Sequence, residues 1–381
     1  MKIYQITTPI DKKEALKELG VESGGISIMA NKMEVYTFYI KDLRTPAANI
    51  LKQDALSIGA DLAVPAGVIT CAKDHYDCIL MGTRKHIEIL SRKELAQPFG
   101  LKNLAKELKQ FLNIKQYKTK IMGVINANED SFFEGSRFVA DEAVEQIKTM
   151  IEQGASIVDI GAVSSRPNAE IVSADEELRR IRSICDVIAV EKLYEKAVFS
   201  IDSYTPNVIE YALERGFKLV NDITGASDER VIELAIKYQA KLCIMHMQGT
   251  PQTMQANPHY DDVMVEVSEF FAERVAKCEA MGLDRSDIIL DVGIGFGKSI
   301  EHNLILIRNL THFQKFGCQI LIGASRKSMI DQIRRTAVED RVAGTLTIHL
   351  KAIENGASIV RCHDVLEHHQ AIAVWEAIEK K

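Results

Sequence analysis

The sequence has few cysteines, no long hydrophobic run and no excess of basic residues. Its seven cysteines are scattered and no two are in CxxC spacing, so the sequence predicts neither a disulfide framework nor a zinc site. No apolar stretch approaches the roughly 20 residues that a membrane span requires, and charged residues follow the start too closely for a signal peptide. A formal net charge of -6 argues against a protein that coats nucleic acid. We therefore expect a cytoplasmic protein with reduced thiols that contacts neither membranes nor nucleic acid.

From Ile121 onward the sequence repeats one pattern eight times: a short apolar run and then a helix-length amphipathic stretch. A parallel strand buried on both faces reads as a continuous Val/Ile/Leu run, and eight strand–helix units are typical of a (β/α)8 TIM barrel, an α/β fold. Such a barrel takes about 250 residues, so the 381-residue chain has roughly a hundred more for a second unit. The apolar runs are IMGVIN, SIVDIG, VFSID, KLVND, KLCIMH, IILDVG, ILIG and SIVRCHD.

The residues that precede the barrel carry a weaker pattern. The polar stretch NIKQYKTK (113–120) predicts a linker, which divides the chain into residues 1–115 and 116–381. Before it, EVYTFYI and CILMGT are typical of strands, and LKNLAKELKQFL spaces its leucines as an amphipathic helix does. This pattern predicts a small α+β N-terminal domain of unknown role, whose polar residues lack a recognisable spacing and are assigned ordinary surface and fold roles. These residues are Asp61, His75, Arg84, Lys85 and His86.

Polar residues end most of the eight apolar runs. In such a barrel the active site lies at the C-terminal ends of the strands, so these residues are predicted to share one pocket. An aspartate at the end of a buried strand needs a partner, and a neutral heterocycle with amino and ring N–H groups would satisfy several carboxylates in bidentate geometry. The alternative that a given aspartate caps a neighbouring loop stays open. The candidates are Asn126, Asp159, Asp202, Asn221, His246, Asp291, residues 325–327, Arg361 and His363.

Cationic residues gather in the loops that follow the later runs. In such barrels the loops after the last two strands often bind phosphate through backbone N–H groups and basic side chains. The sequence therefore predicts that the substrate carries an anionic group. For Arg326 the alternative of an ion pair with a surface carboxylate stays open. The residues concerned are Lys298, Arg326, Lys327, Arg361 and His363.

Two other segments approach known ligand-binding motifs without matching them. GIGFGKS (293–299) lacks the first glycine of a P-loop and the third glycine of a dinucleotide fingerprint. We expect its glycines to let the backbone approach a flat ligand, with Phe296 as an apolar wall. His368 and His369 stand near the start of a helix without metal-ligand spacing, so both are predicted to be solvated.

Eight segments of the barrel, in order along the chain, resemble the motifs of dihydropteroate synthases. Each segment alone is a weak signal, but eight in the right order at the strand ends are highly specific. The resemblance covers Ile121 to the C-terminus and leaves the N-terminal domain outside it. The segments are residues 126–132 (NANEDSF), 164–167 (SSRP), 200–202 (SID), 221–222 (ND), 245–251 (MHMQGTP), 291–298 (DVGIGFGK), 325–328 (SRKS) and 361–364 (RCHD).

The resemblance implies a transferase of folate biosynthesis. Members of this family condense 6-hydroxymethyl-7,8-dihydropterin diphosphate with 4-aminobenzoate and release 7,8-dihydropteroate and diphosphate, with magnesium as the cofactor. The implied mechanism is a dissociative substitution, in which cations stabilise the departing diphosphate and the aniline nitrogen attacks a pterin-stabilised carbocation. Such chemistry depends on positioning and electrostatics rather than on a side-chain nucleophile. A homodimer and a role as a sulfonamide target are further expectations.

The resemblance also assigns roles to residues at the strand ends and in two mobile loops, 127–137 and 162–172. The residues expected to be catalytic are Asp202, Asp291, Lys327 and Arg361. The residues expected to bind the pterin are Asp202, Asn221, Met245, Asp291, Phe296, Lys327 and Arg361. The diphosphate site would comprise Asn126, Arg361 and His363, with Asn126 as the magnesium ligand. The aminobenzoate site would comprise Phe132, Ser165, Arg166, Pro167 and Ser328.

Two alternatives share the expected pterin site. A pterin-binding methyltransferase would keep the barrel and its carboxylates but would have no use for a diphosphate site. A pterin-binding protein that has lost catalysis would use its N-terminal domain as a docking module for a partner. The late cations and the segment Asp130–Phe132 favour the synthase over the methyltransferase. An altered first loop is the support for lost catalysis.

That first loop generates a prediction about kinetics. Asn128 and Glu129 replace the usual Thr-Pro pair, which frees the backbone and adds a negative charge near the expected diphosphate site. We expect retained turnover with altered kinetics or altered sulfonamide sensitivity relative to typical members of the family. Steady-state kinetics and sulfonamide inhibition of the wild type check this expectation. Values equal to those of a typical member in both respects would contradict it.

Overall fold

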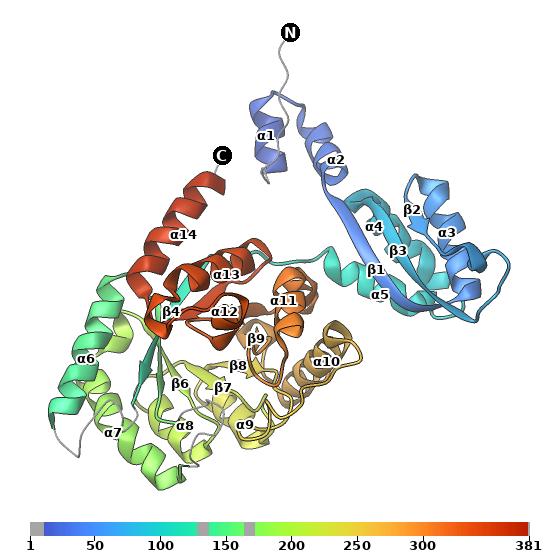
Figure 1. Ribbon diagram of the computed structural model, residues 1–381. Coiled ribbons are helices and arrows are strands. Elements are labelled where there is room, and N and C mark those ends of the chain that lie inside the picture. The colour runs from blue at the N-terminus through green and yellow to red at the C-terminus, as the bar shows by residue number, and fades with distance from the viewer. Residues whose placement is uncertain (1–10, 128–136, 164–171, 380–381) are drawn as a thin grey trace. The chain divides into compact units, whose positions relative to one another are not determined.

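The computed structural model of the protein describes residues 11–127, 137–163 and 172–379 (Figure 1). Among these residues, no helix combines the length and the apolar character that a membrane crossing requires. Contacts within the chain define two compact units, and the division between them falls inside the polar stretch 113–120. The units are Met1–Ile114 with Glu376–Lys381, and Lys115–Trp375.

The N-terminal unit is a three-stranded antiparallel sheet with helices against one face. Its strands β1 (Val35–Arg44), β2 (Asp61–Ala63) and β3 (His75–Thr83) are arranged in the order β1-β3-β2. In β3, Tyr76, Cys78 and Leu80 are buried and the residues between them are exposed, which is the pattern of a sheet with one covered face. The covered face shares a core with the helices Thr45–Ile58, Arg84–Lys93 and Leu101–Phe111 and with the short helix Ala66–Val68, as a small α+β domain requires. The helices are α1 (Lys12–Glu18), α2 (Ser23–Met33), α3 (Thr45–Ile58), η1 (Ala66–Val68), α4 (Arg84–Lys93), η2 (Glu94–Ala96) and α5 (Leu101–Phe111).

The second unit is a closed barrel of eight parallel strands, as the eight apolar runs predict. Each strand pairs with the next along the chain, and the last strand pairs with the first. The strands are β4 (Lys120–Asn126), β5 (Ile157–Gly161), β6 (Val198–Asp202), β7 (Leu219–Asp222), β8 (Lys241–Met245), β9 (Ile288–Asp291), β10 (Gln319–Ile322) and β11 (Ile359–Cys362).

Helices connect the strands and surround the barrel (Figure 1). The Ser173 side chain caps one of them by accepting from the backbone N–H of Glu176, and another begins at Pro206 directly after Thr205. The longer helices are α6 (Arg137–Glu152), α7 (Ala174–Val190), α8 (Pro206–Leu213), α9 (Glu229–Lys237), α10 (Val263–Met281), α11 (Ile300–Arg308), α12 (Ser328–Ile333), α13 (Val342–Glu354) and α14 (Val365–Glu379). Short 3-10 helices are η4 (Leu193–Glu195), η5 (Arg285–Asp287), η6 (Leu310–Phe316) and η7 (Val338–Asp340).

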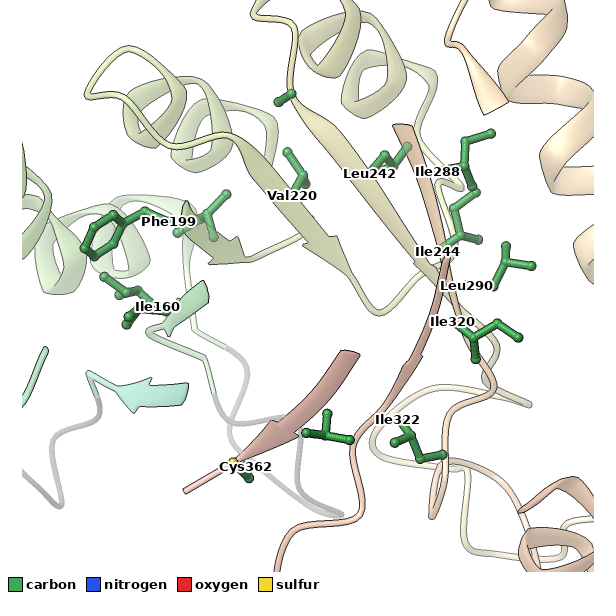
Figure 2. Packing of buried hydrophobic residues seen from close by; sticks show 14 of the residues in the cluster. Ile160, Phe199, Val220, Leu242, Ile244, Ile288, Leu290, Ile320, Ile322 and Cys362 are labelled. Carbon is green, nitrogen blue, oxygen red and sulfur yellow. The ribbon is translucent and has the colours of Figure 1, made fainter. Parts of the chain in front are cut away.

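The barrel wall separates two apolar layers. Outward residues such as Phe199, Leu242 and Leu290 belong to the large core shared with the helices (Figure 2). Inward residues near the N-terminal half of the strands form a separate buried cluster, which we call the barrel floor. Because side chains alternate along a strand, the residue two positions after a floor residue also points inward, one layer closer to the C-terminal mouth. The floor consists of Met122, Ile157, Leu219, Cys243, Ile289, Leu321 and Ile359.

One buried carboxyl group stands out in the N-terminal unit. Glu94 is 0% exposed, and neither of its carboxylate oxygens has a hydrogen-bond partner among the described residues. Burial and the neighbouring carboxylate of Asp54 together raise the pKa of Glu94 to about 7. Asp54 itself pairs with Lys93 at 2.8 Å. Glu94 is therefore protonated over much of the acid range, where its burial is tolerated.

We expect Glu94→Gln to change stability in a pH-dependent way. The folded-state pKa lies above the ordinary value of 4.5, so the contribution of Glu94 is fully present below pH 4.5 and is lost as the pH rises to about 7. Above that pH the wild type carries a penalty of at most about 3 kcal/mol that the variant lacks. Hydrogen exchange of the N-terminal unit in the full chain measures the difference, with the exposed Glu18→Gln as control. An equal effect of Glu94→Gln at pH 4.5 and at about pH 8 would contradict the expectation.

Candidate active site

The polar residues of the candidate site stand directly above the barrel floor. Asp159 follows the floor residue Ile157 by two positions in β5, and Arg361 follows Ile359 by two positions in β11. The same alternation turns four further polar side chains inward from β6, β7 and β9. They are Ser200, which lies opposite Asp159 in the β5–β6 ladder, Asp202, Asn221 and Asp291.

Arg361 links two aspartates across the barrel. Its Nε donates to Asp159 Oδ2 at 2.6 Å, and its Nη2 donates to Asp202 Oδ2 at 2.7 Å. Asn221 Nδ2 donates to the same Asp159 oxygen at 3.0 Å. Burial alone would lower the pKa of Arg361, but the two carboxylates outweigh it and raise the pKa above its usual value. Burial raises the pKa of Asp202 to about 7, against the opposing effect of Arg361.

The opposite side of the mouth combines a carboxylate, a lysine and an aromatic ring. Lys327 Nζ donates to the carbonyl of Ile294 and lies 4.3 Å from the centroid of the Phe296 ring. Burial lowers the pKa of Lys327 to about 8, and Asp291 opposes this shift. Asp291 Oδ1 accepts from Gly293 N at 2.8 Å, yet burial still raises the pKa of this carboxyl group. Phe296 thus lies beside Lys327, and its role as an apolar wall for a ligand stays a prediction.

Lys298 does not serve the mouth. Its side chain is 3% exposed, and Nζ donates to the backbone oxygens of His246 at 3.2 Å, Gly293 at 3.1 Å and Phe296 at 3.0 Å. Burial lowers the pKa of Lys298 to about 7 and that of His246 to about 3, and His246 Nδ1 also lies 2.9 Å from Nζ, so the three N–H groups of the ammonium are shared among four neighbouring acceptors. The prediction that Lys298 belongs to the anion-binding set is wrong, because its ammonium group ties the loops after β8 and β9 together.

The glycine at the start of GIGFGKS, Gly293, also helps to bring the loops after β8 and β9 together. Gly293 has φ 66°, and a Cβ there would lie 2.0 Å from the carbonyl oxygen of His246. The close approach is therefore made to the loop after β8. The expectation that this glycine admits a flat ligand is wrong, since the neighbouring backbone already fills the space.

Arg326 is also committed within the protein. Its Nε and Nη2 donate to the two carboxylate oxygens of Asp364 at 3.0 and 2.5 Å, which confirms the ion-pair alternative left open by the sequence. Without Lys298 and Arg326, the candidates for contact with an anionic ligand are Lys327, Arg361 and His363.

The remaining candidates lie at the carboxyl end of the barrel or outside the description. Asn126 ends β4 with an exposed side chain, and Ser328 is exposed at the start of α12. His363 is exposed, and its Nδ1 lies 2.9 Å from Ser325 Oγ. Met245 is buried at the end of β8. Outside the described residues lie Phe132, Ser165, Arg166 and Pro167, together with most of the ranges 127–137 and 162–172.

Comparisons with known proteins agree with this geometry. The family model for pterin binding enzymes matches residues 122–363. A dihydropteroate synthase of Haemophilus influenzae is 40% identical over 259 residues, which are 68% of this chain and 93% of the relative. The chain belongs to this family, the dihydropteroate synthases. A bifunctional dihydropteroate synthase/dihydropteroate reductase of Helicobacter pylori is 42% identical over 379 residues, or 99% of both chains.

Solved structures of dihydropteroate synthases share the barrel. The Yersinia pestis enzyme with a sulfonamide drug has a TM-score of 0.64 and 35% identity, covering 68% of this chain and 94% of that chain. The Xanthomonas albilineans enzyme in complex with 7,8-dihydropteroate has a TM-score of 0.61 and 31% identity, covering 69% and 94%. The predictions of a (β/α)8 barrel and of a dihydropteroate synthase, a transferase of folate biosynthesis, are confirmed.

The structure of this synthase contains a buried histidine relay that the sequence analysis missed. Ala324 N donates to His349 Nε2 at 3.0 Å, His349 Nδ1 lies 2.8 Å from His368 Nε2, and His368 Nδ1 lies 2.5 Å from the Asp364 carbonyl. Because a backbone N–H donates and a carbonyl accepts, each ring carries its proton on Nδ1. The relay joins the loop after β10 to the start of α14. The prediction of a solvated His368 is wrong, since it is 1% exposed, whereas His369 is exposed as predicted.

We expect His368→Leu to destabilise the barrel by about 1 to 3 kcal/mol, because the variant leaves the His349 Nδ1–H buried without an acceptor. His369→Leu is the matched control, since the side chain of His369 is exposed and its replacement should change stability by less than about 0.5 kcal/mol. Urea denaturation at pH 7.5 to 8 measures the difference between the two variants. Equal stability of the two variants would contradict the relay.

Proposed function

We propose that the barrel condenses 6-hydroxymethyl-7,8-dihydropterin diphosphate with 4-aminobenzoate to give 7,8-dihydropteroate and diphosphate. The observation that carries the proposal is that one mouth holds both carboxylates for N–H groups and cations for an anion. The carboxylates are Asp202 and Asp291, and the cations are Lys327 and Arg361. A methyltransferase would use the carboxylates without the cations.

The orientation of Asn221 determines what this part of the mouth offers a ligand. Asn221 Nδ2 is engaged by Asp159, and because a carboxylate accepts, the amide cannot be reversed without losing that bond. Its Oδ1 is then left to accept from a ligand, as the carboxylates of Asp202 and Asp291 also can. An edge rich in N–H donors, such as the amino and ring N–H groups of a pterin, matches three acceptors. Phe296 supplies a flat apolar surface for the ring.

The diphosphate is proposed to lie near Asn126, Arg361 and His363. Asn126 is exposed at the end of β4 and carries an amide oxygen, and magnesium is commonly held by one or two protein oxygens together with phosphate oxygens. The described residues contain no group of three or more histidine, cysteine or acidic ligands that could hold a metal by themselves. Asn126 therefore fits as a single protein ligand, and the ion would neutralise charge on the leaving group. Arg361 and His363 would contact the remaining oxygens.

The substitution needs no nucleophilic side chain. The bond from the pterin methylene to the diphosphate oxygen breaks with its electron pair on oxygen, the aniline nitrogen forms the new C–N bond, and the aniline proton is lost to solvent. Asp291, a buried carboxylate, would offset the positive charge that develops on the pterin. Cys243 lies in the barrel floor, where burial raises the pKa of its thiol well above its usual value and keeps it unreactive.

An assay with both substrates and magnesium, following dihydropteroate and released diphosphate, tests the proposal. Formation of both products in equal amounts supports the synthase. Binding of the pterin diphosphate without any product would mean a pterin-binding protein that has lost catalysis. Binding of a pterin without affinity for diphosphate would favour the methyltransferase.

We expect Asp291→Asn to lower kcat/KM by on the order of a hundredfold, about 3 kcal/mol, because the variant removes the negative charge that faces the pterin. Asp340→Asn, at an exposed aspartate of the same unit, is the control and should leave kcat/KM unchanged. Steady-state kinetics with the pterin diphosphate as the varied substrate measures both variants. Unchanged kcat/KM in Asp291→Asn would remove Asp291 from the mechanism.

A second activity is suggested by the extent of one alignment. The relatives named simply as dihydropteroate synthases match 68% of the chain, whereas the Helicobacter pylori protein, named also as a dihydropteroate reductase, matches 99% of it. We propose that the full chain also adds a hydride and a proton to the pteridine ring of dihydropteroate. The N-terminal unit is the part of the chain that distinguishes the two sets of relatives.

Reduction requires a hydride donor, which we propose to be a reduced nicotinamide or flavin cofactor. Incubation of the full chain with 7,8-dihydropteroate and each donor in turn, followed by separation of tetrahydropteroate from substrate, tests the activity. Tetrahydropteroate formed with either donor supports the proposal. Unchanged dihydropteroate with both donors, from a preparation that is active as a synthase, would overturn it.

A further inference from the structure

In the protein without ligand, Asp202 and Arg361 form an ion pair with each other. Under the proposed function, Asp202 is a carboxylate that receives N–H groups of the pterin, and Arg361 is a cation that receives the diphosphate. In the structure Arg361 Nη2 instead donates to Asp202 Oδ2 at 2.7 Å. Neither half of the substrate can make its full contact while this ion pair persists. The two halves of the site are therefore linked by a shared bond.

The other end of Arg361 is anchored far more deeply. Asp159, which binds Nε at 2.6 Å, has a side chain that is 0% exposed, whereas the Asp202 side chain is 16% exposed. Asp159 also holds Asn221, and its second oxygen, Oδ1, is buried without a partner among the described residues. Removal of the Arg361 cation from Asp159 would leave a buried carboxylate uncompensated, which is strongly unfavourable. The bond to Asp202, at the mouth, is the one that a ligand can exchange.

We propose that Arg361 is a latch that opens only for an anionic ligand, with Asp159 as its pivot. The diphosphate draws Nη2 away from Asp202, while Nε stays on Asp159, and the freed carboxylate then receives the pterin. This inference rests on the proposed function and assigns Asp159 a positioning role. The latch makes the site selective for a pterin that carries an anionic group. A neutral pterin has to compete with Arg361 for the Asp202 carboxylate.

Such a latch couples two binding events. Diphosphate should tighten the binding of a pterin, and by thermodynamic reciprocity the pterin should tighten diphosphate by the same factor. A charged hydrogen bond exchanged in this way corresponds to a coupling of roughly tenfold or more. Two independent half-sites would instead give a factor of one.

The test divides the substrate into two probes, 6-methylpterin and inorganic diphosphate with magnesium. Titration calorimetry of the full wild-type chain gives the affinity for each probe alone and in the presence of the other. We expect 6-methylpterin to bind roughly tenfold more tightly when diphosphate is present. Equal affinity with and without diphosphate, in a preparation that catalyses the condensation, would overturn the latch and leave the proposed function intact. Absence of pterin binding together with absence of turnover would overturn both.

Three variants separate the latch from a merely structural role. Asp202→Asn removes the competing carboxylate, so diphosphate alone should bind more tightly than to the wild type, a gain that a misfolded variant cannot produce. Arg361→Lys keeps the charge but loses the fork that spans two carboxylates, so the coupling should fall to about one. His363→Gln should weaken diphosphate binding and keep the coupling factor. Unchanged or weaker diphosphate binding in Asp202→Asn, or full coupling in Arg361→Lys, would overturn the proposal.

Discussion

The ion pair between Asp159 and Arg361 is the constraint on which the candidate site depends. A carboxylate that is fully buried in the wall of a barrel must have a partner, and the partner here comes from β11. Once Arg361 is fixed at Nε, its Nη2 reaches Asp202, and Asp159 also fixes the amide orientation of Asn221. One buried charge thus orders side chains from β5, β6, β7 and β11 at the mouth. The apolar floor beneath them excludes water and strengthens these interactions.

The final two loops of the barrel are joined by three separate links. Ser325 contacts His363, Arg326 pairs with Asp364, and the relay of His349 and His368 connects the backbone on either side. Each link alone is a modest interaction, but together they leave the two loops little freedom to move independently. The backbone at Lys327 and Arg361, which flank these links in the sequence, is therefore held in place, and in the proposed latch only the outer end of the Arg361 side chain moves. Such prior ordering suits a site that has to stabilise a leaving anion.

The strands and the polar residues at their ends were predictable because a barrel strand buried on both faces has an unmistakable composition. Beyond the last residue of a strand, side chains no longer alternate between the two faces. The sequence therefore could not predict in which direction a loop side chain points. Lys298 and Lys327 both lie in loops between a strand and the next helix, yet Lys298 turns inward to three carbonyl oxygens. His368 is buried against His349, a partner nineteen residues away in the sequence, and no local sequence pattern predicts this contact. The partners of Asp159 are likewise distant in sequence, so its role could not be inferred from the run SIVDIG.

The distribution of thiols has a practical consequence. Six of the seven cysteines are buried, and Cys71 in the N-terminal unit is exposed. Burial raises the pKa of buried thiols such as those of Cys185, Cys243 and Cys362. A raised pKa lowers the reactivity of a thiol toward electrophiles. A maleimide dye should therefore attach to the natural sequence at one place, without prior removal of other cysteines. The N-terminal unit, whose role the sequence does not define, can thus be labelled with a spectroscopic probe in the wild-type chain.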